Sequence, residues 1–366
     1  MDPETAAVHV DLNDRAYDIE IAAGNLCHTG RFIQSRCDAQ FAAVITDENV
    51  EYPHAEVVAD SLLDADMDVE ILIIEAGEPS KSVPVAETLW ENLIDLGTDR
   101  HSIIVAVGGG VIGDLAGFIA ATYARGIKFF QVPTTLLAQV DSSVGGKVGI
   151  NLPGGKNMVG AFWQPQGVLI DTDVLTTLPD REYRAGLAEV VKYGVILDPE
   201  FFDYLANNVP GLQQRSPEVM RHIVTRSCEM KASVVLQDER ETTGQRAILN
   251  FGHTFCHAIE TVAGYGQLLH GEGVSIGMVC AARLATALHQ VDDSLLTRLR
   301  KLLVELQLPV DVPDLDHDAL LDAMHRDKKA AHGELRFVLP TRLGHVELVP
   351  DVPPEMARQA LSPGEC

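Results

Sequence analysis

The feature that most constrains the fold is an apolar, strand-like segment that runs into a glycine-rich turn and then into a helical pattern. It reads VAVGGGVIGDLAGFIAATYARG and spans residues 105–126. Glycines 108, 109, 110 and 113 let backbone amides approach a ligand closely, and the helix adds the positive end of its dipole. Such a turn is typical of phosphate binding, although a purely structural turn also needs glycine. The spacing departs from the strict G-x-G-x-x-G of dinucleotide-binding proteins.

Similar apolar runs recur through the first half of the chain, and each ends in turn residues. Near-continuous runs of Val, Ile and Leu favour a parallel sheet that helices cover on both faces. A helical pattern at 82–97 fits between two of them. Ligands of such sheets bind at the carboxyl ends of the strands. The predicted strands are 41–50, 69–78, 102–110, 128–135 and 167–173.

After about residue 178 the strand signal fades and helical periodicity takes over. Pro179 stands where a first helical turn tolerates proline. A late hairpin is expected at 334–349. We therefore predict an α/β domain with a parallel sheet over 1–178, a mainly α-helical domain over 179–366, and a cleft between them. The further predicted helices are 217–236, 250–263, 271–289 and 294–306.

The composition excludes several classes of protein. The 366 residues carry 28 Lys plus Arg against 53 Asp plus Glu, a net charge of −25 that repels nucleic acid and anionic membrane surfaces. No apolar run reaches the roughly 18 residues of a membrane span, and the acidic N-terminus lacks the apolar segment of a secretory signal. Six cysteines without CxxC pairing favour reduced thiols and a cytoplasmic location.

Against this acidic background, one basic segment stands out. Between Arg125 and Lys156 four cations face a single acid, Asp141, for a local balance of +3. The stretch 132–157 is also dense in glycine and hydroxyl side chains, which favours a small-anion site. Upstream, Asp47 and Asn49 follow a predicted strand, where an acidic residue holds a ribose in nucleotide-binding sheets. Lys81 follows the next strand and is positioned to approach a pyrophosphate.

Two histidines raise the question of a metal. His253 and His257 stand four residues apart in FGHTFCHAIE, so both rings leave one helix face. They fit a metal pair, a catalytic pair, one of each, or two hydrogen-bonded core residues. Glu189 fits either an ion pair with Lys192 or a third metal ligand, and His270 directly precedes another helix. Two histidines and a carboxylate form a standard catalytic zinc set, in which the ion acts as a Lewis acid.

Long motifs in this chain resemble the 3-dehydroquinate synthases of the shikimate pathway, in the same order, from about residue 40 to 345. The resemblance implies a Rossmann-like NAD-binding domain, a helical domain carrying zinc or cobalt, and a homodimer that acts in aromatic amino acid biosynthesis. The implied reaction is a lyase reaction on 3-deoxy-D-arabino-heptulosonate 7-phosphate. It consists of transient oxidation by NAD, phosphate elimination, re-reduction and an intramolecular aldol closure to 3-dehydroquinate. The motifs are GGGVIGDLAGF, QVPTTLLAQVDSSVGGK, GKNMVGAFWQP, GLAEVVKYG, NFGHTFCHAIE, HGEGVSIGM and DKK.

The resemblance also assigns roles to positions in this sequence. It makes Glu189, His253 and His270 the metal ligands, and His257 an active-site residue in proton relay or phosphate contact. It implies that the phosphate and carboxylate of the substrate are bound by Arg125, Lys156, Asn157, Lys231, Arg246, Asn250 and one of Lys328 or Lys329. The nicotinamide and the substrate hydroxyls fall to Asp141, Lys147 and Lys192. NAD contacts fall to Asp47, Asn49, Ala76, Gly77, Glu78, Pro79, Ser80, Lys81, Gly110, Val111, Ile112, Gly113, Asp114, Thr134, Thr135, Lys147, Lys156, Val174, Leu175, Thr176 and Thr177.

One residue departs from the pattern, and two other kinds of enzyme share it. Cys256 stands where the family pattern has glycine, and we expect it to pack rather than to bind metal. Sugar phosphate cyclases of natural-product pathways share the scaffold and usually differ at the positions of Lys231, Asn250 and His257, where this chain has the residues of the 3-dehydroquinate synthases. A metal-dependent polyol dehydrogenase would not need so many cations. A non-catalytic nucleotide-binding protein would not need a metal set beside an anion site.

Overall fold

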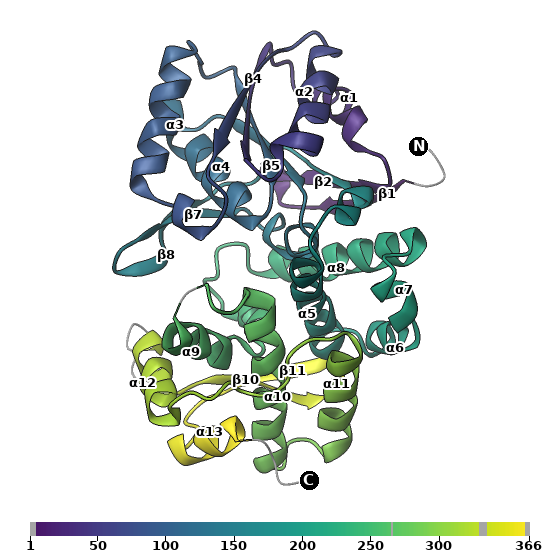
Figure 1. Ribbon diagram of the computed structural model, residues 1–366, viewed down its shortest axis with the longest axis vertical. Coiled ribbons are helices and arrows are strands. Elements are labelled where there is room, and N and C mark those ends of the chain that lie inside the picture. Colours follow the sequence, from purple (N-terminus) through teal and green to yellow (C-terminus); the bar gives the residue numbers. More distant parts are fainter. Residues whose placement is uncertain (1–4, 265, 329–334, 363–366) are drawn as a thin grey trace. The chain divides into compact units, whose positions relative to one another are not determined.

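The computed structural model describes residues 5–264, 266–328 and 335–362, and the chain divides into two compact units (Figure 1). The first unit runs to Leu178 and also includes Pro217–Arg240, and the second comprises Pro179–Ser216 and the chain from Glu241 onward. The helix predicted at 217–236 was expected in the second domain. That helix, α8 (Pro217–Gln237), instead packs against the first two strands of the first unit. Helical periodicity reveals a buried face but not its partner.

The first unit is built on a seven-stranded sheet. Its strands follow the order β1-β2-β9-β6-β5-β3-β4, and all neighbours are parallel except the β1–β2 pair. The five predicted strands are therefore confirmed, and the antiparallel edge hairpin was not predicted. The strands are β1 (Ala6–Val10), β2 (Tyr17–Ala22), β3 (Phe41–Asp47), β4 (Asp68–Ile74), β5 (Ile103–Gly108), β6 (Lys128–Pro133) and β9 (Val168–Asp171).

Alternate residues of the central strands bury opposite faces of the sheet. Val44 and Val105 belong to one core cluster, while Ile45 and Ile104 belong to another. Figure 1 shows α1 and α2 on one face, and α3 and α4 on the other. Both faces are apolar because both are covered, which explains the near-continuous apolar runs. The helices are α1 (Thr29–Gln34), α2 (Glu56–Leu63), α3 (Val83–Asp95) and α4 (Gly110–Thr122), and a separate hairpin joins β7 (Lys147–Leu152) to β8 (Gly155–Phe162).

The second unit is mainly helical, as predicted, with one two-stranded hairpin. Its apolar helix α10 packs against α5, α9, α11, α13 and β10. The predicted helix at 250–263 begins later, at His253, because Gly252 adopts a left-handed φ of 82°. The elements are α5 (Asp180–Ile196), α6 (Pro199–Asn207), α7 (Val209–Gln213), α9 (His253–Ala263), α10 (His270–Ala287), α11 (Asp293–Glu305), α12 (His317–Lys328), α13 (Pro354–Leu361), β10 (Phe337–Arg342) and β11 (His345–Val349). Among the described residues, no helix is both long and apolar enough to span a bilayer.

Glycines let the backbone of α10 contact the backbone of its neighbours directly. A Cβ at Gly271 would lie 1.9 Å from the carbonyl oxygen of Ala185 in α5. A Cβ at Gly277 would lie 2.1 Å from the carbonyl oxygen of Gly252, directly before α9. Real Cβ atoms do not approach so closely, so any side chain at these positions would push the helices apart.

We therefore expect Gly271→Ala to destabilise the second unit. Overpacking costs about 3 kcal/mol, and the better helix propensity of alanine returns about 1 kcal/mol, which leaves a net loss of about 2 kcal/mol. Thermal unfolding should show the transition of this unit lowered by roughly 4–8 °C. Gly154→Ala is the matched control, because a Cβ there meets nothing within 4 Å. Equal melting of the two variants would contradict the close packing of α10 on α5.

Candidate functional site

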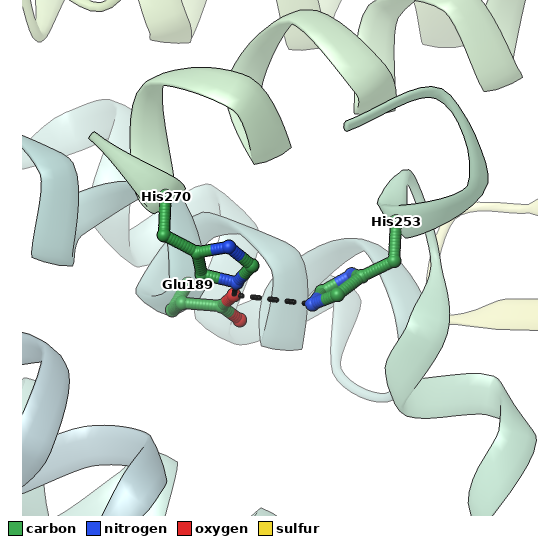
Figure 2. A group of neighbouring side chains, drawn as sticks. All are labelled: Glu189, His253 and His270. Atoms are coloured by element: carbon green, nitrogen blue, oxygen red, sulfur yellow. Dashed lines mark ion pairs between the residues drawn. The ribbon is translucent and has the colours of Figure 1, made fainter. Parts of the chain in front are cut away.

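Three helices of the second unit bring Glu189, His253 and His270 together (Figure 2). Glu189 lies in the middle of α5 and is 1% exposed, while the two histidines are the first residues of α9 and α10. One carboxylate oxygen and one ring nitrogen from each histidine all lie within 4.8 Å of one another. The Nε2 atoms of His253 and of His270 each lie 3.7 Å from Oε1 of Glu189.

These separations fit a metal ion better than a hydrogen-bonded triad. At 3.7 Å the nitrogens are too far from Oε1 for a hydrogen bond. A tetrahedral ion with ligand bonds of about 2.1 Å holds its donor atoms about 3.4 Å apart. Two imidazoles and a carboxylate are also the donor set of catalytic zinc sites that keep an open position. The residues present therefore fit a divalent cation.

Hydrogen bonds on the far side of each ring turn Nε2 toward Glu189. Nδ1 of His253 lies 3.2 Å from the carbonyl oxygen of Phe251, which can only accept, so Nδ1 carries the proton. Nδ1 of His270 lies 3.2 Å from Oε1 of Glu260. In metal sites, a hydrogen-bond acceptor at the ring nitrogen that does not bind the metal fixes the tautomer and the orientation of the histidine. The sequence analysis missed Glu260, although its position four residues after Cys256 on one helix face was a usable signal.

Glu189 makes both of the contacts that the sequence left open. Its Oε2 pairs with the ammonium group of Lys192, one turn along α5, and its Oε1 faces the two histidines. Lys192 is 2% exposed, so the pair is almost fully buried. Because a buried charge must be compensated, the Lys192 ammonium stabilises the Glu189 carboxylate through one oxygen and leaves the other oxygen facing the histidines as a ligand.

The two histidines differ in charge. Burial and the nearby Lys192 hold the pKa of His253 well below its usual value, which keeps the ring neutral. Burial alone would lower the pKa of His270, but its contacts with Cys256 and Glu260 and the charge of Glu189 outweigh burial and raise it. His270 is therefore protonated below this raised pKa, and a metal ion that binds its ring nitrogen must displace a proton.

Hydrogen bonds of Glu272 fix the start of α10, where His270 lies. Its side chain accepts a hydrogen bond of 2.9 Å from the backbone N–H of Leu269, the residue directly before the helix. The same carboxylate forms two bonds of 2.7 Å with the guanidinium of Arg181, at the start of α5. The Arg181–Glu272 pair thus ties the helix that carries Glu189 to the helix that carries His270.

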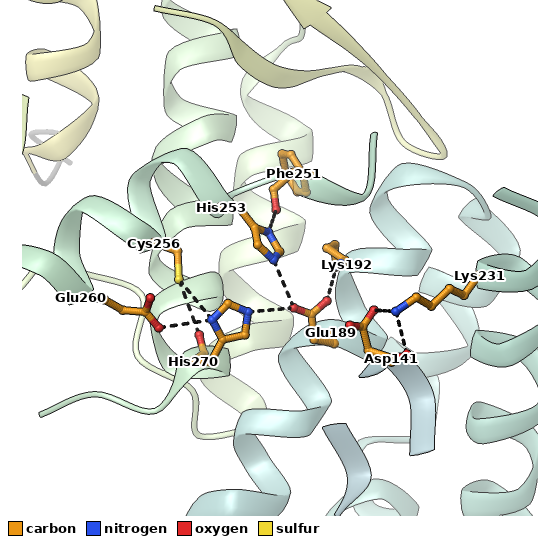
Figure 3. A network of polar contacts seen from close by, with 9 residues as sticks. All are labelled: Asp141, Glu189, Lys192, Lys231, Phe251, His253, Cys256, Glu260 and His270. Atoms are coloured by element: carbon orange, nitrogen blue, oxygen red, sulfur yellow. Dashed lines mark hydrogen bonds and ion pairs between the residues drawn. The ribbon is translucent and has the colours of Figure 1, made fainter. Parts of the chain in front are cut away.

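His257 and Cys256 flank this set without joining it. The His257 ring is exposed, and its centroid lies 5.6 Å from that of His253. The Cys256 thiol is buried, with Sγ 3.9 Å from Nδ1 of His270. Figure 3 shows both the thiol and Glu260 on the side of the His270 ring away from Glu189.

In the first unit, the expected nucleotide residues lie at the carboxyl ends of parallel strands. Strand β4 lies on one side of β3, and the next strand along the chain, β5, lies on the other side. The direction in which strands are added therefore reverses between β3 and β5. Ligands of open α/β sheets bind at such a reversal. Asp47 ends β3 and accepts a 2.9 Å hydrogen bond from the backbone N–H of Asn49. Gly110–Asp114 opens α4 directly after β5, Thr134 and Thr135 follow β6, and Val174–Thr177 follows β9.

Lys81 joins three of the expected segments of this unit. It is 4% exposed, and its Nζ lies 2.7 Å from Oδ2 of Asp114 and 2.7 Å from Oδ1 of Asn157. Burial raises the pKa of Asp114, and the Lys81 ammonium opposes that rise. The loop 76–81, the start of α4 and the hairpin β7–β8 are thus connected by one buried cation.

The remaining expected residues fall in both units. Figure 3 also draws the ion pair of the first unit in which Nζ of Lys231 lies 2.8 Å from Oδ1 of Asp141. Arg246 of the second unit is buried, with Nε 3.5 Å from Oε1 of Glu241, and Asn250 is exposed. Arg125, Lys147 and Lys156 are exposed on the first unit. Lys328 is the last residue of α12, and Lys329 lies outside the described residues.

Comparison with known proteins gives matches over both units. The family model described as 3-dehydroquinate synthase N-terminal matches residues 71–185, and the C-terminal model matches residues 186–330. A curated 3-dehydroquinate synthase of Rhodopirellula baltica is 51% identical over 361 residues, which is 97% of this chain and 96% of that protein.

Two solved structures of sugar phosphate cyclases are also similar. A 2-deoxy-scyllo-inosose synthase, complexed with carbaglucose-6-phosphate, NAD+ and Co2+, is 27% identical with a TM-score of 0.89 over 97% of this chain and 99% of that one. A 2-epi-5-epi-valiolone synthase of Streptomyces hygroscopicus, with NAD+ and Zn2+ bound, is 28% identical with a TM-score of 0.87 over 94% of this chain and 95% of that one. Because the family models match more than half of the chain and the curated relative covers nearly all of it, the chain belongs to the 3-dehydroquinate synthase family.

Proposed function

We propose that this chain is a 3-dehydroquinate synthase, a lyase that converts 3-deoxy-D-arabino-heptulosonate 7-phosphate to 3-dehydroquinate and phosphate with bound NAD and a divalent metal ion. The observation that carries the proposal is the convergence of Glu189, His253 and His270, whose ligand atoms lie within 4.8 Å of one another. The identity of 51% with a curated 3-dehydroquinate synthase favours this reaction over those of the cyclases that are 27% and 28% identical.

The metal-binding role falls to the three side chains of the second unit. A zinc or cobalt ion held by them would polarise oxygen atoms of the substrate as a Lewis acid. The chain contributes the orientation of the ligands, through the bonds of His253 to Phe251 and of His270 to Glu260. It also contributes the buried charge of Glu189, which makes the site selective for a cation.

The NAD-binding role falls to the first unit. Bound NAD would accept a hydride from the C5 carbinol of the substrate and return it later in the same turnover, so no net oxidation results. The reversal of strand order between β3 and β5 supports this assignment, as does the glycine turn at the start of α4. The residues proposed to contact NAD are Asp47, Asn49, 76–81, 110–114, Thr134, Thr135, Lys147, Lys156 and 174–177.

The cationic side chains are proposed to bind the phosphate and carboxylate of the substrate. A doubly anionic sugar needs several fixed cations in a chain whose net charge is −25. Held in one geometry, such a substrate reacts intramolecularly, so positioning carries the later ring closure. His257 is proposed to relay a proton or to contact the phosphate. The anion-binding residues are Arg125, Lys156, Asn157 and Lys231 of the first unit, and Arg246, Asn250 and Lys328 or Lys329 of the second, with Asp141, Lys147 and Lys192 at the hydroxyls and nicotinamide.

We also propose that the protein is a cytoplasmic homodimer. Free cysteines at all five described positions are typical of a reducing compartment. Three large apolar side chains of the β7–β8 hairpin, Leu152, Met158 and Phe162, are exposed, and this supports self-association because exposed apolar groups are enriched at interfaces. Light scattering of the purified protein should give the mass of two chains, and a single-chain mass would reject the dimer.

One assay tests the proposed reaction. Purified protein supplied with a divalent metal, NAD and the heptulosonate phosphate should release phosphate and form dehydroquinate in equal amounts, without net NADH. Phosphate release without dehydroquinate would instead indicate a related cyclase. Accumulation of NADH would indicate a dehydrogenase. Inactivity of a protein with verified metal content would refute an enzymatic function.

Glu189→Gln should remove activity chiefly through loss of metal. The variant keeps the size of the side chain but loses the charge that a divalent cation requires, and we expect metal affinity to fall at least about 100-fold. Metal content after dialysis and the turnover rate measure the two effects together. Glu182→Gln, an exposed change on the same helix, is the control and should retain both. Unchanged zinc content and rate in Glu189→Gln would refute the ligand assignment.

Lys231→Ala should impair substrate use while NAD binding stays nearly intact. Loss of one charge-assisted bond to an anionic substrate group costs about 2–3 kcal/mol, so kcat/KM should fall roughly 30- to 150-fold. The NAD dissociation constant, measured by fluorescence titration, should change by less than about twofold. Lys301→Ala removes a cation that is 73% exposed and should change neither quantity. A parallel loss of NAD affinity in Lys231→Ala would contradict the assignment.

A further inference from the structure

We propose that Cys256, Glu260 and His270 form a second metal site, one that contains a thiolate and competes with the Glu189 set for His270. A thiol, a carboxylate oxygen and a ring nitrogen from these residues all lie within 4.8 Å of one another. Nδ1 of His270 lies 3.2 Å from Oε1 of Glu260 and 3.9 Å from Sγ of Cys256 (Figure 3). This site stands on its own geometry and does not depend on the proposed function.

The placement of the donors follows from the two helices. Cys256 and Glu260 stand four residues apart in α9, so both side chains leave the same face. His270 begins α10, and its ring meets that face. A tetrahedral ion with bonds of about 2.3 Å to sulfur and about 2.1 Å to nitrogen keeps those atoms about 3.6 Å apart. The observed separations therefore need only small side-chain rotations to accept an ion.

The neighbouring residues leave space for the Cys256 thiol and leave the other two donors accessible to solvent. A Cβ at Gly273 would lie 2.7 Å from Sγ of Cys256, so glycine at this position makes room for the sulfur. The Cys256 thiol is fully buried, whereas the side chain of Glu260 is 13% exposed and that of His270 is 36% exposed. An ion can thus arrive from solvent at the carboxylate and the imidazole, and take the thiolate from the buried side.

The shared imidazole makes the two sites compete as long as the ring keeps one proton. In a neutral imidazole one nitrogen carries the proton and only the other offers a lone pair. A carboxylate oxygen accepts, so in a neutral His270 ring that bonds to Glu260 the proton lies on Nδ1, and Nε2 faces Glu189. An ion bound at Nδ1 requires that this proton move to Nε2, while the thiol releases its own proton to solvent. The Glu189 set then loses one of its three donors. Because thiolates prefer soft ions, cadmium, or zinc in excess, should act in this way.

Cadmium is the probe, because the Glu189 set contains no sulfur. The parent protein should carry Cys27→Ser, Cys37→Ser and Cys366→Ser, which removes three of the five thiols outside the cluster and leaves the buried Cys228 and Cys280. It should first be loaded with cobalt, whose visible spectrum reports the Glu189 set. Added Cd2+ should produce a sulfur-to-cadmium charge-transfer band that saturates at one ion per chain, and should change the cobalt spectrum as His270 is withdrawn.

Two variants and a matched control make the result specific. Cys256→Ala should abolish the charge-transfer band while its cobalt spectrum stays native, which also shows that the protein is folded. Glu260→Gln should weaken cadmium binding at least tenfold. Cys280→Ala removes another buried thiol of the second unit and should leave the band intact.

A band that is absent from the parent, or unchanged in Cys256→Ala, would overturn the site. A cobalt spectrum that is indifferent to cadmium would overturn the competition for His270. Each readout is spectroscopic, so its failure is distinguishable from failure of the proposed enzymatic reaction.

Discussion

Close contact between helix backbones is the constraint on which the metal-binding residues depend. α5, α9 and α10 carry one member each of the Glu189 set, and α10 touches both neighbours through glycines. Gly271 meets the carbonyl of Ala185 one turn before Glu189, and Gly277 meets the carbonyl of Gly252 one residue before His253. Side chains at these contacts would separate the helices by more than an ion with bonds of about 2.1 Å can bridge. Metal geometry in this unit is therefore a consequence of helix packing.

The fold was largely predictable because burial on two faces leaves a strong signal. Strands such as Phe41–Asp47 and Ile103–Gly108 are apolar throughout, and the parallel sheet follows from that composition. The edge strand Ala6–Val10 is short and half exposed, so it carried no comparable signal. The helix Pro217–Gln237 was predicted as a helix, but it was assigned to the second unit and belongs to the first. Its apolar face shows that it packs, while only the three-dimensional structure shows against which sheet.

The metal-binding residues were predictable from residue types and family motifs. The contacts that orient those residues were harder to predict. The sequence offered an ion pair with Lys192 and a ligand role as alternatives for Glu189, and the structure places its two oxygens in both settings. Glu260 shares a helix face with Cys256, but its contact with His270 depends on how α9 packs against α10. The ion pair between Arg181 and Glu272 joins residues 91 positions apart, and no sequence pattern predicted it. Contacts between distant helices depend on packing that a one-dimensional pattern does not encode.

Helix dipoles explain why two carboxylates accompany the two histidines. His253 and His270 are both first residues of helices, where the dipole contributes partial positive charge. That charge favours neutral imidazole, the form that binds metal, but it also repels the cation itself. Glu189 lies against both rings and Glu260 against one, so their negative charges offset the two helix ends. Burial and the nearby Lys192 lower the pKa of His253, whose Nδ1 meets only the backbone carbonyl of Phe251. The His270 side has two carboxylates and a raised pKa. Because Glu260 lies beside Nδ1 of His270, on the side of the ring away from Glu189 (Figure 3), this ring has donor atoms near it for a second cation.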